Sequence, residues 1–173
     1  GANETASADT AAYDRAINTW TAGPKLPRPL HHVTAVTYKG EAVVIGGFVP
    51  GAELTSGQSD RVYALRGGAW QELPRLNHAR AAAAAAVVGD KIIVVGGQAN
   101  GKLVPETEVF DGKGWTDVAA MPTPREHLAA ASDGRYLYAV GGRDLSADKN
   151  TEALERYDPA SDSWTKLEGM PTA

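Results

Sequence analysis

The sequence lacks cysteine altogether, which excludes disulfides and thiolate sites. It also lacks an apolar run near the length of about 18 residues that spans a bilayer, and it shows no cleavable signal segment. Basic residues are in the minority, with 17 Lys and Arg against 21 Asp and Glu and a net charge of -4. Because nucleic acids and anionic membranes attract a basic excess, we expect neither nucleic acid nor direct membrane contact.

Aromatic residues are also scarce, at 7% of the chain, but the four tryptophans are regularly spaced. Trp20, Trp70, Trp115 and Trp164 lie 50, 45 and 49 residues apart. Another aromatic residue precedes them by seven, seven, five and seven positions: Tyr13, Tyr63, Phe110 and Tyr157. A glycine pair lies 26 positions after each of the first three: Gly46-Gly47, Gly96-Gly97 and Gly141-Gly142. Self-similarity at this period indicates one structural unit repeated along the chain.

One copy of the unit, from Arg80 to Met121, is typical of four short strands. The β-branched segment 91–95 ends at a glycine pair, and segments 107–110 and 115–118 flank an Asp-Gly turn. The alanine-rich segment 81–88 has the residue type with the highest helix propensity. The aligned segments of the other copies are less helix-like and lead straight into turns, so we predict a strand here too. Four antiparallel strands repeated in tandem indicate propeller blades.

The pattern resembles the kelch repeat, in which an arginine opens the first strand, Gly-Gly closes the second, an aromatic-Asp pair lies on the third and a tryptophan on the fourth. Arg80 and Arg125 stand at the arginine position, ten residues after a tryptophan. Aromatic-Asp pairs occur at Tyr13-Asp14, Phe110-Asp111 and Tyr157-Asp158, whereas Tyr63-Ala64 lacks the acid. In the first full repeat Leu30 takes the arginine position, with Arg28 two residues earlier. The resemblance implies an all-β fold of kelch-type blades, and it leaves the activity open because fold does not fix function.

Counting strands gives about three and a half blades. We expect a disordered N-terminal tail or tag at residues 1–8, a half blade of two outer strands at 9–26, and full blades at 27–76, 77–121 and 122–173. Known propellers have at least about four blades. Three explanations stay open: a fragment of a longer propeller, a ring completed by a second copy, or an open half-propeller.

The strand pattern also predicts which face binds. The loops between the second and third strands are long in each full blade, at 48–60, 98–106 and 143–152, and they emerge beside the starts of the first strands. Long polar loops on a rigid scaffold are the usual seat of binding. We expect a protein or peptide segment, or a small anionic ligand, to bind on this face. The candidate binding residues are Arg28, His32, Asn77, Arg80, Arg125, His127 and Arg143.

Two interpretations of Arg80 and Arg125 stay open. In kelch propellers these arginines often line a peptide pocket, so the resemblance implies guanidinium groups that bind a carboxylate or phosphate. Alternatively, each guanidinium bonds to backbone carbonyls or to an acid between blades. His31 and His32 are neighbours and would point to opposite faces of a strand, so we expect no metal site and no cofactor.

No catalytic constellation is visible, and we predict a non-catalytic recognition module. Among kelch-like propellers, a copper oxidase would need the cysteine that this chain lacks. A sugar mutarotase would need an acid paired with an arginine, for which Glu126 beside Arg125 is the candidate. The alternatives are therefore a mutarotase-like enzyme and an assembly module that forms a homodimer through open blade edges. The alanine-rich, cysteine-free sequence is also compatible with the extracytoplasmic sensing part of a larger bacterial signalling protein.

Overall fold

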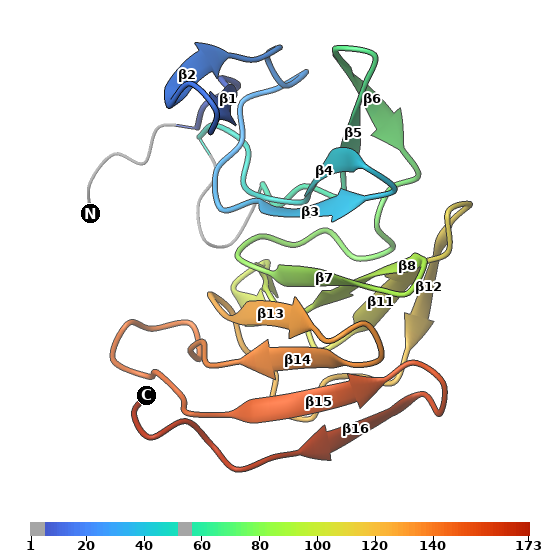
Figure 1. Cartoon of the computed structure of the whole chain (residues 1–173). Coiled ribbons are helices and arrows are strands. Elements are labelled where there is room, and N and C mark those ends of the chain that lie inside the picture. The colour runs from blue at the N-terminus through green and yellow to red at the C-terminus, as the bar shows by residue number, and fades with distance from the viewer. Residues whose placement is uncertain (1–5, 52–56) are drawn as a thin grey trace.

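A computed structural model describes residues 6–51 and 57–173, and all regular secondary structure in these ranges is β. Three four-stranded antiparallel sheets follow one another along the chain, and a two-stranded hairpin precedes them (Figure 1). This arrangement confirms the all-β fold of kelch-type blades. Residues 1–5 of the expected tail lie outside the described ranges, whereas Ser7 exchanges two backbone hydrogen bonds with Leu30.

The strands have the following bounds. The hairpin consists of β1 (Ala11–Asp14) and β2 (Thr19–Ala22). The first full sheet contains β3 (Thr34–Tyr38), β4 (Glu41–Ile45), β5 (Val62–Arg66) and β6 (Ala69–Leu73). The second contains β7 (Ala84–Val88), β8 (Lys91–Val95), β11 (Thr107–Phe110) and β12 (Trp115–Val118). The third contains β13 (Ala129–Ser132), β14 (Leu137–Val140), β15 (Leu154–Asp158) and β16 (Ser163–Lys166).

The first strands of the three full sheets, β3, β7 and β13, pack side by side, which makes them the inner strands of the fan. The loop from β8 to β11 also forms a small hairpin, β9 (Gln98–Ala99) and β10 (Lys102–Leu103), that the sequence pattern did not indicate. Isolated bridges join the residue that opens each long loop to the residue three positions before an inner strand: Phe48 to His31, Gln98 to Ala81, and Arg143 to Glu126. The long loops therefore do begin beside the starts of the inner strands.

The alanine run forms a strand, as predicted, but the strand begins at Ala84 rather than Ala81. Ala82 has a left-handed φ of 53°, which an extended strand does not contain. Ala84 and Ala86 pack toward the third sheet, while Ala83 and Ala85 pack toward the first. Small side chains on both faces let β7 fit between two close neighbours, and this tertiary packing overrides the helix propensity of alanine.

Each interface between neighbouring sheets is a separate hydrophobic core. The first core is formed mainly by Val43, Ile45, Ile92, Val94 and Phe110, which are almost completely buried. The second core is formed mainly by Ile93, Val95, Leu137, Ala139 and Tyr157. Residues that alternate along β8 thus face opposite neighbours, as the period of two in a strand requires.

The strand register corrects one alignment made from the sequence. The residue opposite the tryptophan is Phe110 in the second sheet and Tyr157 in the third, but in the first sheet it is Leu65 rather than Tyr63. The tight turn at Gly67–Gly68 shortens the hairpin between β5 and β6 by two residues relative to the last hairpin of the chain. Tyr63 instead lies opposite Glu72, at the register position that Glu108 and Glu155 occupy in the other sheets.

The glycine pairs are required by close backbone contacts at the blade interfaces. Gly96 has a φ of 64°, and a Cβ atom there would lie 2.5 Å from the carbonyl oxygen of Arg125 in the next blade. A Cβ atom on Gly97 would lie 2.8 Å from the carbonyl oxygen of Ala81 in its own blade. Only glycine combines this backbone conformation with this approach distance.

Candidate functional site

The Arg80 side chain has no exposed surface, and its partners all belong to its own blade. It donates hydrogen bonds to the carbonyl oxygens of Gly96, at 3.0 Å, and Glu106, at 2.8 Å. It also forms a 2.7 Å ion pair with the equally buried carboxylate of Glu108. Burial lowers the pKa of the Arg80 guanidinium, and the charge of Glu108 opposes this effect. Of the two open interpretations, the bond to carbonyls and an acid matches these contacts.

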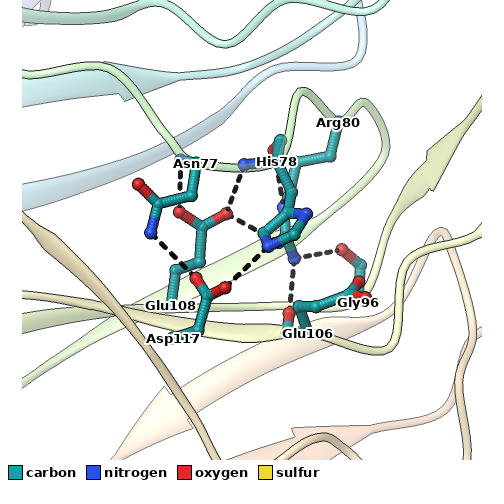
Figure 2. A network of polar contacts seen from close by, with 7 residues as sticks. All are labelled: Asn77, His78, Arg80, Gly96, Glu106, Glu108 and Asp117. Carbon is teal, nitrogen blue, oxygen red and sulfur yellow. Dashed lines mark hydrogen bonds and ion pairs between the residues drawn. The ribbon is translucent and has the colours of Figure 1, made fainter.

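The Arg80–Glu108 pair is the centre of a wider network (Figure 2). Glu108 accepts the backbone N–H groups of Asn77, at 2.6 Å, and His78, at 3.1 Å. The side chains of the same two residues donate to Asp117, at 2.9 and 2.8 Å. These hydrogen bonds, that from Asn77 first, lower the pKa of Asp117. The network fixes the segment that leads into the second blade, and it uses Asn77 for that purpose.

Arg125 has the same role in the third blade. Its guanidinium forms a 2.5 Å ion pair with buried Glu155 and donates to the carbonyl oxygens of Gly141, at 2.6 Å, and Ala139, at 2.9 Å. In the first blade the equivalent pair is replaced by Leu30 and Tyr63, both buried. Burial raises the pKa of the Tyr63 phenol, an effect that Arg28 opposes through its charge. Arg28 is itself exposed and belongs to the segment just before Leu30.

A second polar cluster lies where the inner strands start, and we call it the mouth cluster: Gln98, Glu126, His127, Arg143, His31 and His32. Its centre is the fully buried carboxylate of Glu126. Arg143 Nε donates to Glu126 at 2.5 Å and Gln98 Nε2 donates at 3.2 Å, while His127 Nδ1 forms a close contact with the same carboxylate. The side chains of His127 and Arg143 are 31% and 30% exposed, so they form the solvent-facing part of the cluster.

The histidines extend the cluster toward the first blade. The rings of His32 and His127 lie 4.9 Å apart, edge to face, and His31 Nδ1 lies 2.6 Å from His32 Nδ1. Phe48 packs against the His31 side of the cluster, where the centroids of the stacked His31 and Phe48 rings lie 5.1 Å apart. We expected neighbouring histidines to diverge, and that expectation was wrong. His32 has a φ of 52°, so the alternation of an extended strand does not apply to it.

Backbone hydrogen bonds explain why this position repeats. The His127 N–H donates to the Ala82 carbonyl at 2.8 Å, and the Ala82 N–H donates to the His32 carbonyl at 3.0 Å. All three residues have φ values of 52° or 53°. The equivalent residues of three blades are therefore joined in a row across the inner strands, and the row brings His32 and His127 together although they are far apart in sequence.

A shallow pocket of about 200 Å³ adjoins the exposed part of the mouth cluster. It is lined by His127, Gly141, Gly142, Arg143, Asn150 and Thr151, among others. Of the predicted binding residues, the structure thus brings together His32, His127 and Arg143. It places Arg80 and Asn77 in a polar network of the second blade, Arg125 in the matching network of the third, and Arg28 outside the mouth cluster. Sequence reasoning missed Gln98 and Phe48, which share with Arg143 the first position after the glycine pair.

Within residues 6–51 and 57–173, no group of three or more His, Asp or Glu side chains is placed to hold a metal ion. The same part of the chain contains no helix that could cross a membrane. Arg125 and Glu126, the pair that a mutarotase would need, point apart: Arg125 binds Glu155, whereas Glu126 binds Arg143.

Tandem four-stranded antiparallel sheets with buried arginine–glutamate pairs and paired glycines define a β-propeller repeat protein. The family model described as Kelch motif matches residues 79–122 and 124–171, which together exceed half of the chain. The chain therefore belongs to the kelch-repeat family.

Curated relatives agree. Alpha-scruin of Limulus polyphemus is 26% identical over 177 residues, covering 92% of this chain and 19% of the relative. Human Kelch-like protein 38 is 28% identical over 166 residues, covering 92% of this chain and 27% of the relative. Human Kelch-like protein 34 is 29% identical over 178 residues, covering 94% and 28%. The chain thus spans about a fifth to a quarter of the length of these relatives. Kelch repeats generally mediate protein–protein interaction, which is consistent with a non-catalytic recognition module.

Proposed function

We propose that the chain is a recognition module whose mouth cluster binds an acidic side chain of a protein segment. The observation that carries this proposal is the grouping of Arg143 and His127 on the buried carboxylate of Glu126, with the His32 ring against His127 and His31 against His32. Guanidinium and imidazole groups are hydrogen-bond donors that suit a carboxylate ligand.

Burial divides the cluster into a support and a binding surface. Glu126 is fully buried and holds Arg143 and His127 in place through one carboxylate. The side chains of Arg143 and His127 are about one-third exposed and line the pocket. A ligand carboxylate at the pocket would meet a guanidinium whose position is already fixed, which reduces the entropy lost on binding.

The size of the pocket favours a side chain over a free small molecule. Sites for drug-sized ligands and cofactors occupy about 300–1,000 Å³, whereas this pocket has about 200 Å³. One Asp or Glu side chain fits that volume. The rest of the partner would lie across the long loops, where main-chain and side-chain groups of the partner add contact area.

The test is a fluorescence-polarisation titration of the protein with a labelled peptide that contains two central Glu residues, alongside the same peptide with Gln. We expect the Glu peptide to bind more tightly, and Arg143→Gln to weaken its binding by about 10- to 100-fold, the range for a hydrogen bond to a charged group. Arg15→Gln, which removes an exposed arginine on the hairpin turn, is the matched control and should leave the affinity unchanged.

Equal affinity for the Glu and Gln peptides, or an unchanged affinity in Arg143→Gln, would refute the proposal. Competition with succinate separates the two sources of a carboxylate. Displacement of the peptide by succinate at similar concentration would show that the site takes a small anion, whereas weak displacement supports a protein segment.

A second candidate function is assembly with another copy of the chain, and it is favoured by the exposure of Tyr13 and Trp20 on the first hairpin. The remaining alternatives are a mutarotase-like activity, which a sugar-epimerisation assay tests, and a sensing role outside the cytoplasm. The sensing role stays a prediction from the sequence.

A further inference from the structure

The three full sheets share one contact that joins each to the element before it. In each sheet the indole N–H of the tryptophan on the outer strand donates to a carbonyl oxygen of the preceding blade. The pairs are Trp70 to Pro24, at 2.8 Å, Trp115 to Pro74, at 2.8 Å, and Trp164 to Ala119, at 2.9 Å. Every acceptor stands four residues after the tryptophan of its own blade. The same hydrogen bond therefore joins each of the three full sheets to the blade before it.

The first hairpin presents the donor side of this contact to solvent. Trp20 pairs with Tyr13 in the register of the later tryptophans, and their ring centroids lie 5.1 Å apart. The hairpin is the first element of the described chain, so no described sheet precedes it. Trp20 is 69% exposed and Tyr13 is 48% exposed, whereas the equivalent Trp115 is 9% exposed. An exposed aromatic pair of this kind marks an interaction surface.

The last sheet presents the acceptor side. Glu168 stands four residues after Trp164, which is the position of the acceptor carbonyls in the earlier blades. Glu168 is exposed. Figure 1 shows this sheet, β13 to β16, and the hairpin β1–β2 at opposite ends of the molecule. The donor hairpin and the acceptor sheet therefore do not meet each other within the described residues of one copy.

The outer face of the last sheet carries a residue suited to an aromatic partner. In each sheet one residue of the third strand lies opposite the tryptophan, and the residue before it in sequence points to the other face. That preceding residue is Ala64 in the first sheet and Val109 in the second. Both are buried in the core toward the next sheet, where Val109 shares its cluster with Tyr157 and Trp164. In the last sheet this position is Arg156. Its register thus directs it toward the aromatic pair of a following blade.

The Arg156 guanidinium can accept a further aromatic contact at this face. Its guanidinium lies 4.4 Å from the centroid of the Tyr136 ring, so it already stacks on one aromatic residue. Its Nε atom is buried and has no hydrogen-bond partner within the described residues. Arginine stacks well on tryptophan and tyrosine faces, and an aromatic pair is the group that a following blade would bring.

We propose that two copies of the chain associate head to tail, with the Tyr13–Trp20 face of one copy docked on the outer face of β13 to β16 of the other. In this arrangement the Trp20 indole donates to the Glu168 carbonyl of the partner copy, and Arg156 packs against the Tyr13–Trp20 rings. This inference rests on the second candidate function and gives it a surface. The interface is heterologous, because two different patches meet, and it continues the blade-to-blade contact already present within the chain.

Sedimentation velocity between about 1 µM and about 1 mM, the range of weak interface affinities, tests the proposal. We expect concentration-dependent association of the wild-type chain. Trp20→Ala and Arg156→Glu should each weaken it by at least about tenfold, as the removal of an interface anchor does. Leu145→Ser, which alters another exposed apolar residue on a loop of the third blade, is the control and should associate like the wild type.

Mixing the two variants tests the head-to-tail geometry. Trp20→Ala retains an intact last sheet and Arg156→Glu retains an intact hairpin, so an equimolar mixture should form dimers and nothing larger. A mixture that stays monomeric would overturn the heterologous interface. Wild-type association that neither substitution weakens would overturn this surface but leave the assembly function standing. A wild-type monomer at every concentration would overturn both.

Discussion

The buried pair of Arg80 and Glu108 offers a severe test of what stabilises the second blade. Glu108→Gln keeps the volume of the side chain but removes its charge. The carboxylate is completely buried and accepts one guanidinium and two backbone N–H groups, those of Asn77 and His78. The substitution leaves the buried Arg80 charge without a counter-ion, and it replaces one acceptor oxygen with an amide group that donates toward N–H groups.

Removal of one partner from a buried ion pair costs about 3–5 kcal/mol of folding free energy. That is about a fifth or more of the total stability of an ordinary domain, which is about 5–15 kcal/mol. With a urea m-value of about 2 kcal/mol/M, the unfolding midpoint should fall by about 2 M. Tryptophan fluorescence reports the transition directly, because Trp70, Trp115 and Trp164 each donate to a neighbouring blade.

Two further variants show whether the reasoning is right. Glu72→Gln removes a partly exposed acid that pairs with Arg61 on the surface, and the midpoint should barely move. The double variant Arg80→Leu with Glu108→Tyr copies the first blade, where Leu30 and Tyr63 are buried at the same positions. It should be more stable than Glu108→Gln alone, because an apolar pair leaves no buried charge. A midpoint shift in Glu108→Gln as small as that in Glu72→Gln would refute the argument.

Two other single substitutions, at Gly96 and Tyr157, have expected effects on the stability of the fold. Gly96→Ala should destabilise the chain by about 1–3 kcal/mol, because a Cβ atom there would lie 2.5 Å from the Arg125 carbonyl oxygen and φ is 64°. Gly114→Ala is the control in urea unfolding, because its Cβ atom would meet nothing within 4 Å. Equal unfolding midpoints for the two variants would contradict the glycine argument. For Tyr157, burial and then its hydrogen bond to Asp162 raise the pKa of the phenol in the folded state. A raised folded pKa stabilises the fold below the unfolded pKa of about 10, and this contribution is lost as the pH rises above it. Tyr157→Phe should therefore flatten the loss of stability between about pH 10 and 12, and an unchanged alkaline limb in urea titrations would contradict this.

Comparison of sequence and structure shows where pattern reasoning is sufficient. Turn dipeptides, the paired glycines and the spacing of the tryptophans predicted the strands because each depends on local backbone geometry. The alignment of Tyr63 with Tyr157 failed because it counted seven residues back from each tryptophan, although the hairpin of the first sheet is two residues shorter than that of the third. Register is a property of pairing, so only the partner strand settles it.

The candidate site shows the same division. The loops and the side of the molecule that carries them could be predicted from strand order. The grouping of His31, His32 and His127 could not, because it depends on left-handed backbone conformations at His32 and His127. The burial of Arg80 could not be predicted either, since the sequence allowed its guanidinium to lie at a binding pocket or between blades.

The amino-acid sequence by itself therefore determined the repeat, the all-β class and the membership in the kelch family, since these depend on periodicity and turn chemistry along the chain. Only the tertiary structure decided which charges are internal. Arg80 finds its carboxylate 28 residues away and Arg125 finds its own 30 residues away. Whether such a group meets a carboxylate or solvent depends on how separate segments pack, and no local pattern encodes that contact.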